Sequence, residues 1–259
     1  MAADLAKTAD TVDILGIPIV RWTERETMDA LLAYAKDAEA GATRLPHFVT
    51  YANPHCLNLS RKDPAYREAL RSADVVYADG AGTVWASRTL GGACPERVTA
   101  SDFLKDFVRI AEREGVSFFL LGGHPGTAER MAEGLKALAP GLRIAGTQHG
   151  FITEADDDAV IAAVGAAKPG ILLLGMSVPK QEIWLAKHRN RLKVPLLWCV
   201  GGAFDFYSGR TRRAPPWVIR VHMEWFYRFL QEPGRMWKRY FIGNLTFISR
   251  IYVQKLFGR

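Results

Sequence analysis

Asp79 is the carboxylate in this chain that is best placed to do chemistry. It follows the apolar run Val75-Val76-Tyr77 and precedes Gly80, so the sequence places it just beyond a buried strand. A carboxylate that is partly desolvated at the mouth of a sheet can serve as a general base. An aspartate in a turn more often bonds its own backbone, and the residues alone leave both roles open.

Polar and glycine residues also gather after the other expected strands. They are Asn53, Gly122-Gly123, the segment from Gly175 to Gln181 and the segment from Gly201 to Asp205. In open α/β sheets ligands bind at the carboxyl ends of the strands, so these turns predict the rim of one site. For any single glycine of this kind, a tight turn alone is an equally good explanation, but several such turns on one rim favour a site.

Two further motifs suggest dinucleotide binding and metal binding, but neither matches the expected pattern well. The run Gly122 to Gly126 has the geometry of a phosphate cradle, but its third glycine comes too early for the dinucleotide fingerprint and Pro125 intervenes. The second motif is the acidic run Asp156-Asp157-Asp158, which resembles a metal-binding motif. It follows Thr153 and is expected in the first turn of a helix, where the helix dipole favours acidic residues, so a structural role explains it better. Lys180-Gln181, near another helix start, could contact an anionic leaving group.

We expect no metal site and no resident cofactor. Three histidines in turns lack a partner at metal-ligand spacing, and the three cysteines are odd in number and lack that spacing too. These residues are His55, His124 and His149, and Cys56, Cys94 and Cys199. Such cysteine usage is typical of a reducing compartment.

Repeated strands, glycine-rich turns and helices predict an α/β body with a largely parallel sheet flanked by helices. Strands are expected at 48–52, 75–77, 116–121, 142–146, 171–174 and 196–200, after a hairpin over 12–20. Helices are expected at 25–39, up to about 71, at 101–114, 127–138 and 154–167, and up to about 191. Thr23 and Glu26 have the capping-box spacing that starts the first helix, and Ser101 is the expected cap of the third.

The excess positive charge lies at the end of the chain. Residues 210–259 hold eleven Lys or Arg against Glu224 and Glu232, whereas the preceding residues hold 23 basic and 25 acidic residues. Eleven of the 28 aromatic residues lie in the same segment. We therefore expect an α/β catalytic domain over 1–209 and a basic, aromatic helical appendage over 210–259.

The appendage has the composition of a membrane-interface segment. Helices are expected at 217–231 and 236–257, with apolar residues recurring around their basic residues. A helical hairpin packed on the core is the alternative. Binding to nucleic acid fits the sequence less well, because the basic residues share their helices with many large apolar residues. The polar N-terminus and the lack of a long apolar run indicate a cytoplasmic protein bound peripherally to the membrane.

Several segments together resemble the WecG/TagA/CpsF glycosyltransferase family (glycosyltransferase family 26). The resemblance covers about residues 12 to 245 in order, and its Pro-Lys-Gln-Glu and Arg-Ala-Pro segments are specific. The matching segments are 50–54 (TYANP), 77–80 (YADG), 96–98 (ERV), 119–123 (FLLGG), 146–151 (GTQHGF), 175–182 (GMSVPKQE), 201–205 (GGAFD), 212–215 (RRAP), 224–228 (EWFYR) and 232–235 (EPGR).

The resemblance implies a Rossmann-like fold of GT-E type and a bacterial enzyme that moves a sugar from a UDP-sugar to a polyprenyl-diphosphate-linked sugar, with inversion and without a metal. Such enzymes build cell-envelope polymers, among them wall teichoic acid linkage units and exopolysaccharide. Asp79 takes the place of the general base. The implied donor site comprises Thr50, Asn53, Arg97, Gly122, Gly123, Phe151, Lys180, Gln181, Gly201, Gly202 and Asp205. The implied acceptor and membrane residues are Arg213, Arg228, Arg235 and Arg239.

The chain departs from the family pattern in two places. Thr50 stands three residues before Asn53, where many members show Thr-x-Asn, which leaves the role of Thr50 open, and Ala100 replaces a common glycine.

Two other classes also stay open: a nucleotide-dependent oxidoreductase, which lacks its fingerprint here, and a non-enzymatic membrane adaptor, which does not account for the polar rim. Association into homo-oligomers is undecided, and the donor sugar cannot be read from the sequence.

Overall fold

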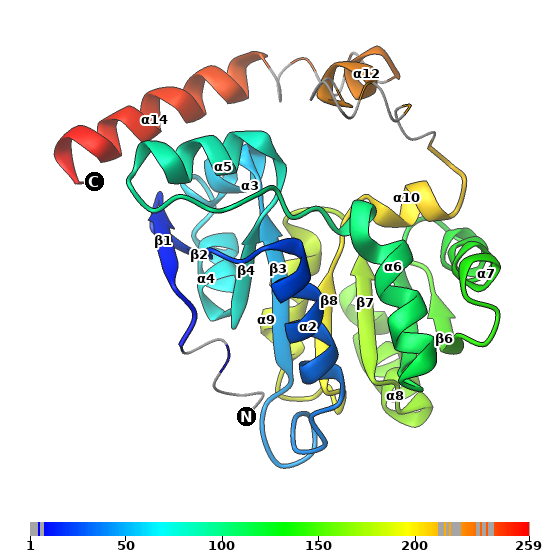
Figure 1. The fold of residues 1–259 in the computed structure, drawn as a ribbon. Helices are drawn as coiled ribbons and strands as arrows, with labels where there is room; N and C mark the ends of the chain where they lie inside the picture. The colour runs from blue at the N-terminus through cyan, green and yellow to red at the C-terminus, as the bar shows by residue number, and fades with distance from the viewer. Residues whose placement is uncertain are drawn as a thin grey trace.

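The sheet is the centre of the fold. A computed structural model (Figure 1) describes residues 5, 8–211, 215, 218, 224–231, 234, 237 and 241–258. In this part of the chain, eight strands form one sheet in the order β1-β2-β4-β3-β8-β7-β5-β6. β1 and β2 pair as an antiparallel hairpin, and the other neighbouring strands pair in parallel. The predicted α/β class with a largely parallel sheet is confirmed.

The strands form where the sequence has its apolar runs. All residues of β4, β5, β7 and β8 are buried, as expected of parallel strands that are covered on both faces. The strands are β1 (Thr11–Ile14), β2 (Ile17–Val20), β3 (His47–Ala52), β4 (Val75–Ala78), β5 (Ser117–Gly122), β6 (Arg143–Gln148), β7 (Ile171–Gly175) and β8 (Leu196–Cys199).

Helices connect the strands and cover the two faces. They are α2 (Glu24–Ala35), α3 (Pro54–Ser60), α4 (Pro64–Ser72), α5 (Gly80–Thr89), α6 (Ala100–Arg113), α7 (Thr127–Leu138), α8 (Asp157–Ala167), α9 (Lys180–His188), α10 (Ala203–Tyr207), α12 (Glu224–Gln231) and α14 (Gly243–Phe257). A short 3-10 helix, η1 (Glu154–Asp156), precedes α8.

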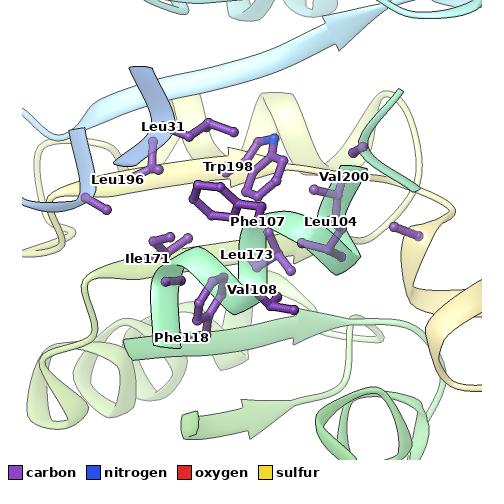
Figure 2. Close-up of a cluster of buried hydrophobic side chains, with 14 of the residues drawn as sticks. Leu31, Leu104, Phe107, Val108, Phe118, Ile171, Leu173, Leu196, Trp198 and Val200 are labelled. Atoms are coloured by element: carbon purple, nitrogen blue, oxygen red, sulfur yellow. The ribbon is translucent and has the colours of Figure 1, made fainter. Parts of the chain in front are cut away.

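The core has one layer on each face of the sheet. Helices α2, α6 and α7 pack on one face, and α3, α4, α8 and α9 supply residues to the clusters on the other. Figure 2 shows the first layer, where the ring of Phe107 on α6 meets Trp198 on β8 edge-on at 5.3 Å between centroids. Leu197, the strand residue next to Trp198, belongs to the opposite layer. This period-two alternation fixes the register of the strands.

Local capping explains where α2, α3 and α4 begin. The capping box of Thr23 and Glu26 is present and starts α2 as predicted. The single helix expected up to about residue 71 is instead two, because Asp63 caps a new helix that begins at Pro64. Helix α5 has no clear sequence signal, since glycines at its start lower helix propensity. The residue at the cap position of α6 is Thr99, not Ser101.

Helix α14 joins the end of the chain to the body. In Figure 1 it runs along the top of the molecule above α3 and α5, and it packs against both. Phe247 and Ile251 are buried in the same cluster as residues of β1 and β4. The Gln254 amide donates to the carbonyl of Asp13 and accepts from the Leu15 amide, at 2.9 Å each. The division into domains 1–209 and 210–259 stays a prediction, and α14 shares its core with the first of them.

We predict that Ile251→Ala lowers the free energy of unfolding by about 2 to 5 kcal/mol, because the side chain is fully buried and truncation leaves a cavity. Leu245→Ala on the same helix is the control. Leu245 is 71% exposed, so its loss should change stability by less than about 0.5 kcal/mol. Urea unfolding measures both, and equal effects would mean that α14 does not dock as described.

Candidate functional site

A cavity of about 1300 Å³ opens at the carboxyl ends of the parallel strands. Residues that follow β3, β4, β5, β6, β7 and β8 contribute to its wall, and Asn244, Phe247 and Ile248 of α14 close one side. The predicted rim of one site is therefore present. The predicted residues that line the cavity are Asn53, Asp79, Arg97, Gly123, Phe151, Lys180, Gly201, Gly202 and Asp205.

Asp79 lies in the cavity wall with both carboxylate oxygens bonded to other elements. Oδ2 accepts a hydrogen bond from Nδ2 of Asn53 at 3.1 Å, and Oδ1 accepts one from Oγ1 of Thr99 at 2.8 Å. Asp79 stands at the cap position of α5, yet its side chain makes no capping bond there. The alternative role, that of an aspartate that bonds only its own turn, does not describe this residue.

The position of Asp79 is fixed by its backbone as well. Its amide donates to the carbonyl of Ala52 at the end of β3, and the Thr83 hydroxyl bonds the carbonyls of both Ala52 and Asp79. Asn53, the residue after β3, also caps α3 through bonds from the amides of His55 and Cys56. The ends of β3 and β4 thus hold the carboxylate and one of its donors next to each other.

The two predicted donor-site cations line the cavity, and both are held in place. Arg97 Nη2 lies 2.6 Å from Asp102 Oδ2 in a partly buried ion pair. Lys180 Nζ donates to the carbonyls of Gly150 and Ile152 at 3.1 and 2.7 Å. Fixed cations in a partly desolvated cavity suit an anionic ligand better than mobile surface cations do.

The glycines of the rim permit close approaches that a side chain would block. A Cβ on Gly122 would lie 2.6 Å from the carbonyl oxygen of Gly175, so this glycine lets the ends of β5 and β7 come together. Gly123 and Gly201 have φ of +67° and +51°, in the left-handed region. A Cβ on Gly201 would also meet the Tyr51 hydroxyl at 2.1 Å.

An aromatic pair stands at the rim. Phe151, after β6, is 59% exposed, and its ring centroid lies 4.3 Å from that of His124, after β5. Both residues line the cavity. An exposed planar pair at the mouth of a polar cavity offers a stacking surface to a flat ligand such as a nucleobase.

Three predicted donor residues lie behind the cavity wall and not in it: Thr50, Gly122 and Gln181. Thr50 and Gln181 are fully buried, and both donate hydrogen bonds to Oε1 of Glu182, at 3.2 and 2.7 Å. This junction ties the end of β3 to the start of α9, so its residues support the site without facing a ligand there. Burial raises the pKa of the Glu182 carboxyl to about 7, although the bonds from Gln181 and Thr50 oppose the shift.

The three aspartates at the start of α8 have structural roles, as predicted. Asp156 forms a capping box with Thr153, and Asp158 pairs with Arg191. Asp157 is buried, where it accepts from the Trp184 indole at 2.7 Å and lies 2.9 Å from His188 Nε2. Within the described ranges, no group of His, Cys, Asp and Glu side chains is arranged to hold a metal ion.

The predicted basic residues of the appendage fall where the chain is not described. Arg213, Arg235 and Arg239 lie outside the described residues, and so does the side chain of Arg228, whose backbone belongs to α12. Among the helices that the structure does describe, none combines the length and apolar character needed to cross a bilayer.

Comparison with known proteins identifies the family. A model of the glycosyl transferase WecG/TagA/CpsF family matches residues 12–259. The chain belongs to this family. Relatives from Staphylococcus aureus strains MW2 and COL, both named N-acetylglucosaminyldiphosphoundecaprenol N-acetyl-beta-D-mannosaminyltransferase, are 30% identical over 245 residues, which cover 95% of this chain and 91% of each relative. The resemblance read from the motifs is confirmed, and with it the transferase class over the oxidoreductase and the adaptor.

Some residues of this WecG/TagA/CpsF member lie at the site without having been predicted. Thr99, Trp85 and His124 line the cavity, and Glu182 organises the residues behind it. Glu182 lies within the matching segment 175–182, so its position was visible, but its partner Thr50 is 132 residues away in the sequence. Nothing in the sequence singled out Thr99, since Ser101 was the expected cap of that helix.

We predict that Glu182→Gln makes the stability of the protein less dependent on pH. The folded protein keeps this proton up to about pH 7, whereas the unfolded chain releases it near 4.5, so the contribution of Glu182 to stability falls as the pH rises through that window. Glutamine cannot ionise. As the pH rises and Glu182 of the wild type ionises, the free energy of unfolding of the variant should therefore increase relative to that of the wild type by up to about 3 kcal/mol.

Urea unfolding between about pH 5 and pH 8 measures the difference between the two proteins. The exposed Glu68→Gln serves as the control and should show no such trend. A Glu182→Gln difference that stays constant across the series would contradict the raised pKa.

Proposed function

We propose that the protein transfers a sugar from a UDP-sugar to a saccharide carried on a polyprenyl diphosphate, with inversion and without a metal ion, at the cytoplasmic face of the membrane. The observation that supports this most is Asp79, a carboxylate in the wall of a large cavity with each oxygen held by one hydrogen bond. An ionised carboxylate oxygen has further acceptor capacity, so Asp79 can still accept a proton from a substrate.

In the proposed reaction, a hydroxyl of the acceptor saccharide attacks the anomeric carbon of the donor. Its proton passes to Asp79 as the new C–O bond forms, and the bond between the sugar and UDP breaks on the opposite side. One displacement of this kind inverts the anomeric centre. UDP leaves as an anion, whose charge Arg97 and the start of α6 at Ala100 and Ser101, which line the cavity, are placed to meet.

The donor is proposed to lie over the ends of β5, β6, β7 and β8. Phe151 and His124 offer the stacking surface for the uracil ring, and the turns at Gly123 and Gly201 let the backbone approach the ligand closely. Thr50 and Gln181 act from behind through Glu182. Asp205, which lines the cavity beside the turn at Gly201-Gly202, is a further donor-site residue in this proposal.

The acceptor is proposed to enter from the side of α14. Trp85 on α5 lines the cavity there, and its ring packs against the rings of Phe247 and Tyr252 on α14. The relatives from Staphylococcus aureus are named for the transfer of N-acetylmannosamine to a GlcNAc-diphosphoundecaprenol. We propose an acceptor of the same class here, in the synthesis of a cell-surface polysaccharide or exopolysaccharide.

The outer side of α14 supports a membrane contact. Its large apolar residues that face solvent are Leu245, Tyr252, Val253, Leu256 and Phe257, and Phe241 and Ile242 precede them. A helix that exposes apolar side chains beside a cavity for a lipid-linked substrate suits an orientation in the interface plane. We propose that the arginines 213, 228, 235 and 239 meet the lipid phosphates.

We predict that Asp79→Asn lowers the transfer rate by at least about 10² to 10⁴, because asparagine keeps the shape but cannot take the proton. UDP should bind within a fewfold of wild type. Transfer is measured by mass spectrometry of the lipid-linked product, and UDP binding by calorimetry. Asp158→Asn is the matched control and should be unaffected, because Asp158 is exposed, pairs with Arg191 and does not line the cavity. An Asp79→Asn variant with most of its turnover would show that Asp79 is a structural residue.

We predict that replacing Leu245 and Leu256 together by Glu weakens binding to phosphatidylglycerol vesicles by at least about tenfold, since burial of a leucine contributes about 1.5 to 3 kcal/mol. These residues are 71% and 72% exposed, so the fold should persist. Leu45→Glu is the control, because Leu45 is exposed in the loop that joins α2 to β3. That loop lies at the opposite end of the molecule from α14 (Figure 1). Unchanged sedimentation of the double variant with vesicles would place the membrane contact elsewhere.

A further inference from the structure

Thr99 occupies the cap position of α6 but does not cap it. A threonine at this position usually accepts a hydrogen bond from an amide in the first turn, which stabilises the helix by about 1 kcal/mol. Here no such bond is made. The hydroxyl instead donates to Oδ1 of Asp79 at 2.8 Å. The side-chain bond of Thr99 therefore goes to the carboxylate of Asp79 and not to its own helix.

The contrast with Asn53 makes this arrangement specific. Asn53 accepts from two amides of α3 and also donates to Asp79, so it would be needed as a cap even without the carboxylate. Thr99 has only the second role. The starts of α3, α5 and α6 meet at one carboxylate, and each oxygen of Asp79 receives one donor from a different helix start.

Two donors are needed to orient such a carboxylate. The torsion that turns the carboxyl group of an aspartate is broad, so one bond leaves the plane of the group free to rock. Asp79 is only half-buried, and packing alone does not hold it. With Asn53 on one oxygen and Thr99 on the other, the plane is fixed, and each oxygen keeps acceptor capacity toward the cavity.

We propose that Thr99 is a positioning residue for the transfer reaction, whose hydroxyl holds the carboxylate of Asp79 in the orientation that accepts the proton of the acceptor hydroxyl. This inference rests on the proposed function, in which Asp79 is the base. Thr99 acts through Asp79 and not on the donor, so its loss should slow turnover and leave nucleotide binding unchanged.

The test compares Thr99→Val, Thr99→Ser and Asp79→Asn in the full chain. Thr99→Val keeps the shape and removes the hydroxyl, and kcat should fall by about 10- to 100-fold, as expected for a misplaced catalytic group. The KM for the UDP-sugar and the affinity for UDP should stay within about threefold of wild type. Thr99→Ser retains the hydroxyl and should restore kcat to within about threefold of wild type. Rates are expressed per UDP-binding site, so that lost stability does not count as lost turnover.

Thr89→Val is the control for the chemical change itself. The hydroxyl of Thr89 bonds the carbonyl of Trp85 within α5 and has no contact with Asp79, so kcat should be unchanged. If Asp79→Asn is inactive while Thr99→Val turns over like wild type, the role of Thr99 is overturned and the proposed function stands. A Thr99→Ser variant as slow as Thr99→Val would also overturn it. If Asp79→Asn is itself active, the proposed function fails and the inference fails with it.

Discussion

Hydrogen bonding between parallel strands brings the carboxyl ends of β4, β3, β8, β7 and β5 to one edge of the sheet, and the site depends on this alignment. The two layers of core on its faces keep the strands in register, as the alternation of Trp198 and Leu197 between layers shows. Because every chain segment that leaves this edge must turn, the polar and glycine residues of the turns face one cavity. The position of Asp79 beside Asn53 follows from the pairing of β4 with β3.

Alignment of strands gives positions, and hydrogen bonds between distant segments give orientations. The carboxylate of Asp79 is oriented by donors from two other helix starts, and the start of α9 is joined to β3 through Thr50, Gln181 and Glu182. Ionisation of the buried Glu182 carboxyl lowers the stability of the fold at high pH. We attribute the presence of a glutamate at this position to the hydrogen bonds by which it joins β3 to α9. Both arrangements place polar groups where packing alone would favour apolar ones.

The sequence predicted the strands well, because a continuous apolar run that ends in glycine or asparagine is typical of a buried strand in an α/β chain. It also placed Asp79 and most of the rim correctly, since a residue after a parallel strand can lie only at that edge. It did not predict α5, whose glycine-rich start reads as a turn, or the break at Asp63. The partners of Thr99 and Thr50 were beyond reach, because each is set by the approach of segments that lie far apart in the chain. The sequence offered packing of the C-terminal helices on the core only as an alternative. It did not identify Phe247 and Ile251 as the buried residues, because the buried and exposed sides of α14 are both apolar.

The central claim is that one cavity performs a single displacement with a carboxylate as base, and the configuration of the product tests it most directly. The purified protein is supplied with an α-linked UDP-N-acetylmannosamine and a short polyprenyl diphosphate that carries N-acetylglucosamine, and the anomeric configuration of the new linkage is determined by NMR. A β-linked disaccharide is the predicted result, because one displacement inverts the centre. An α-linked product would require two displacements or a different mechanism, and would contradict the account.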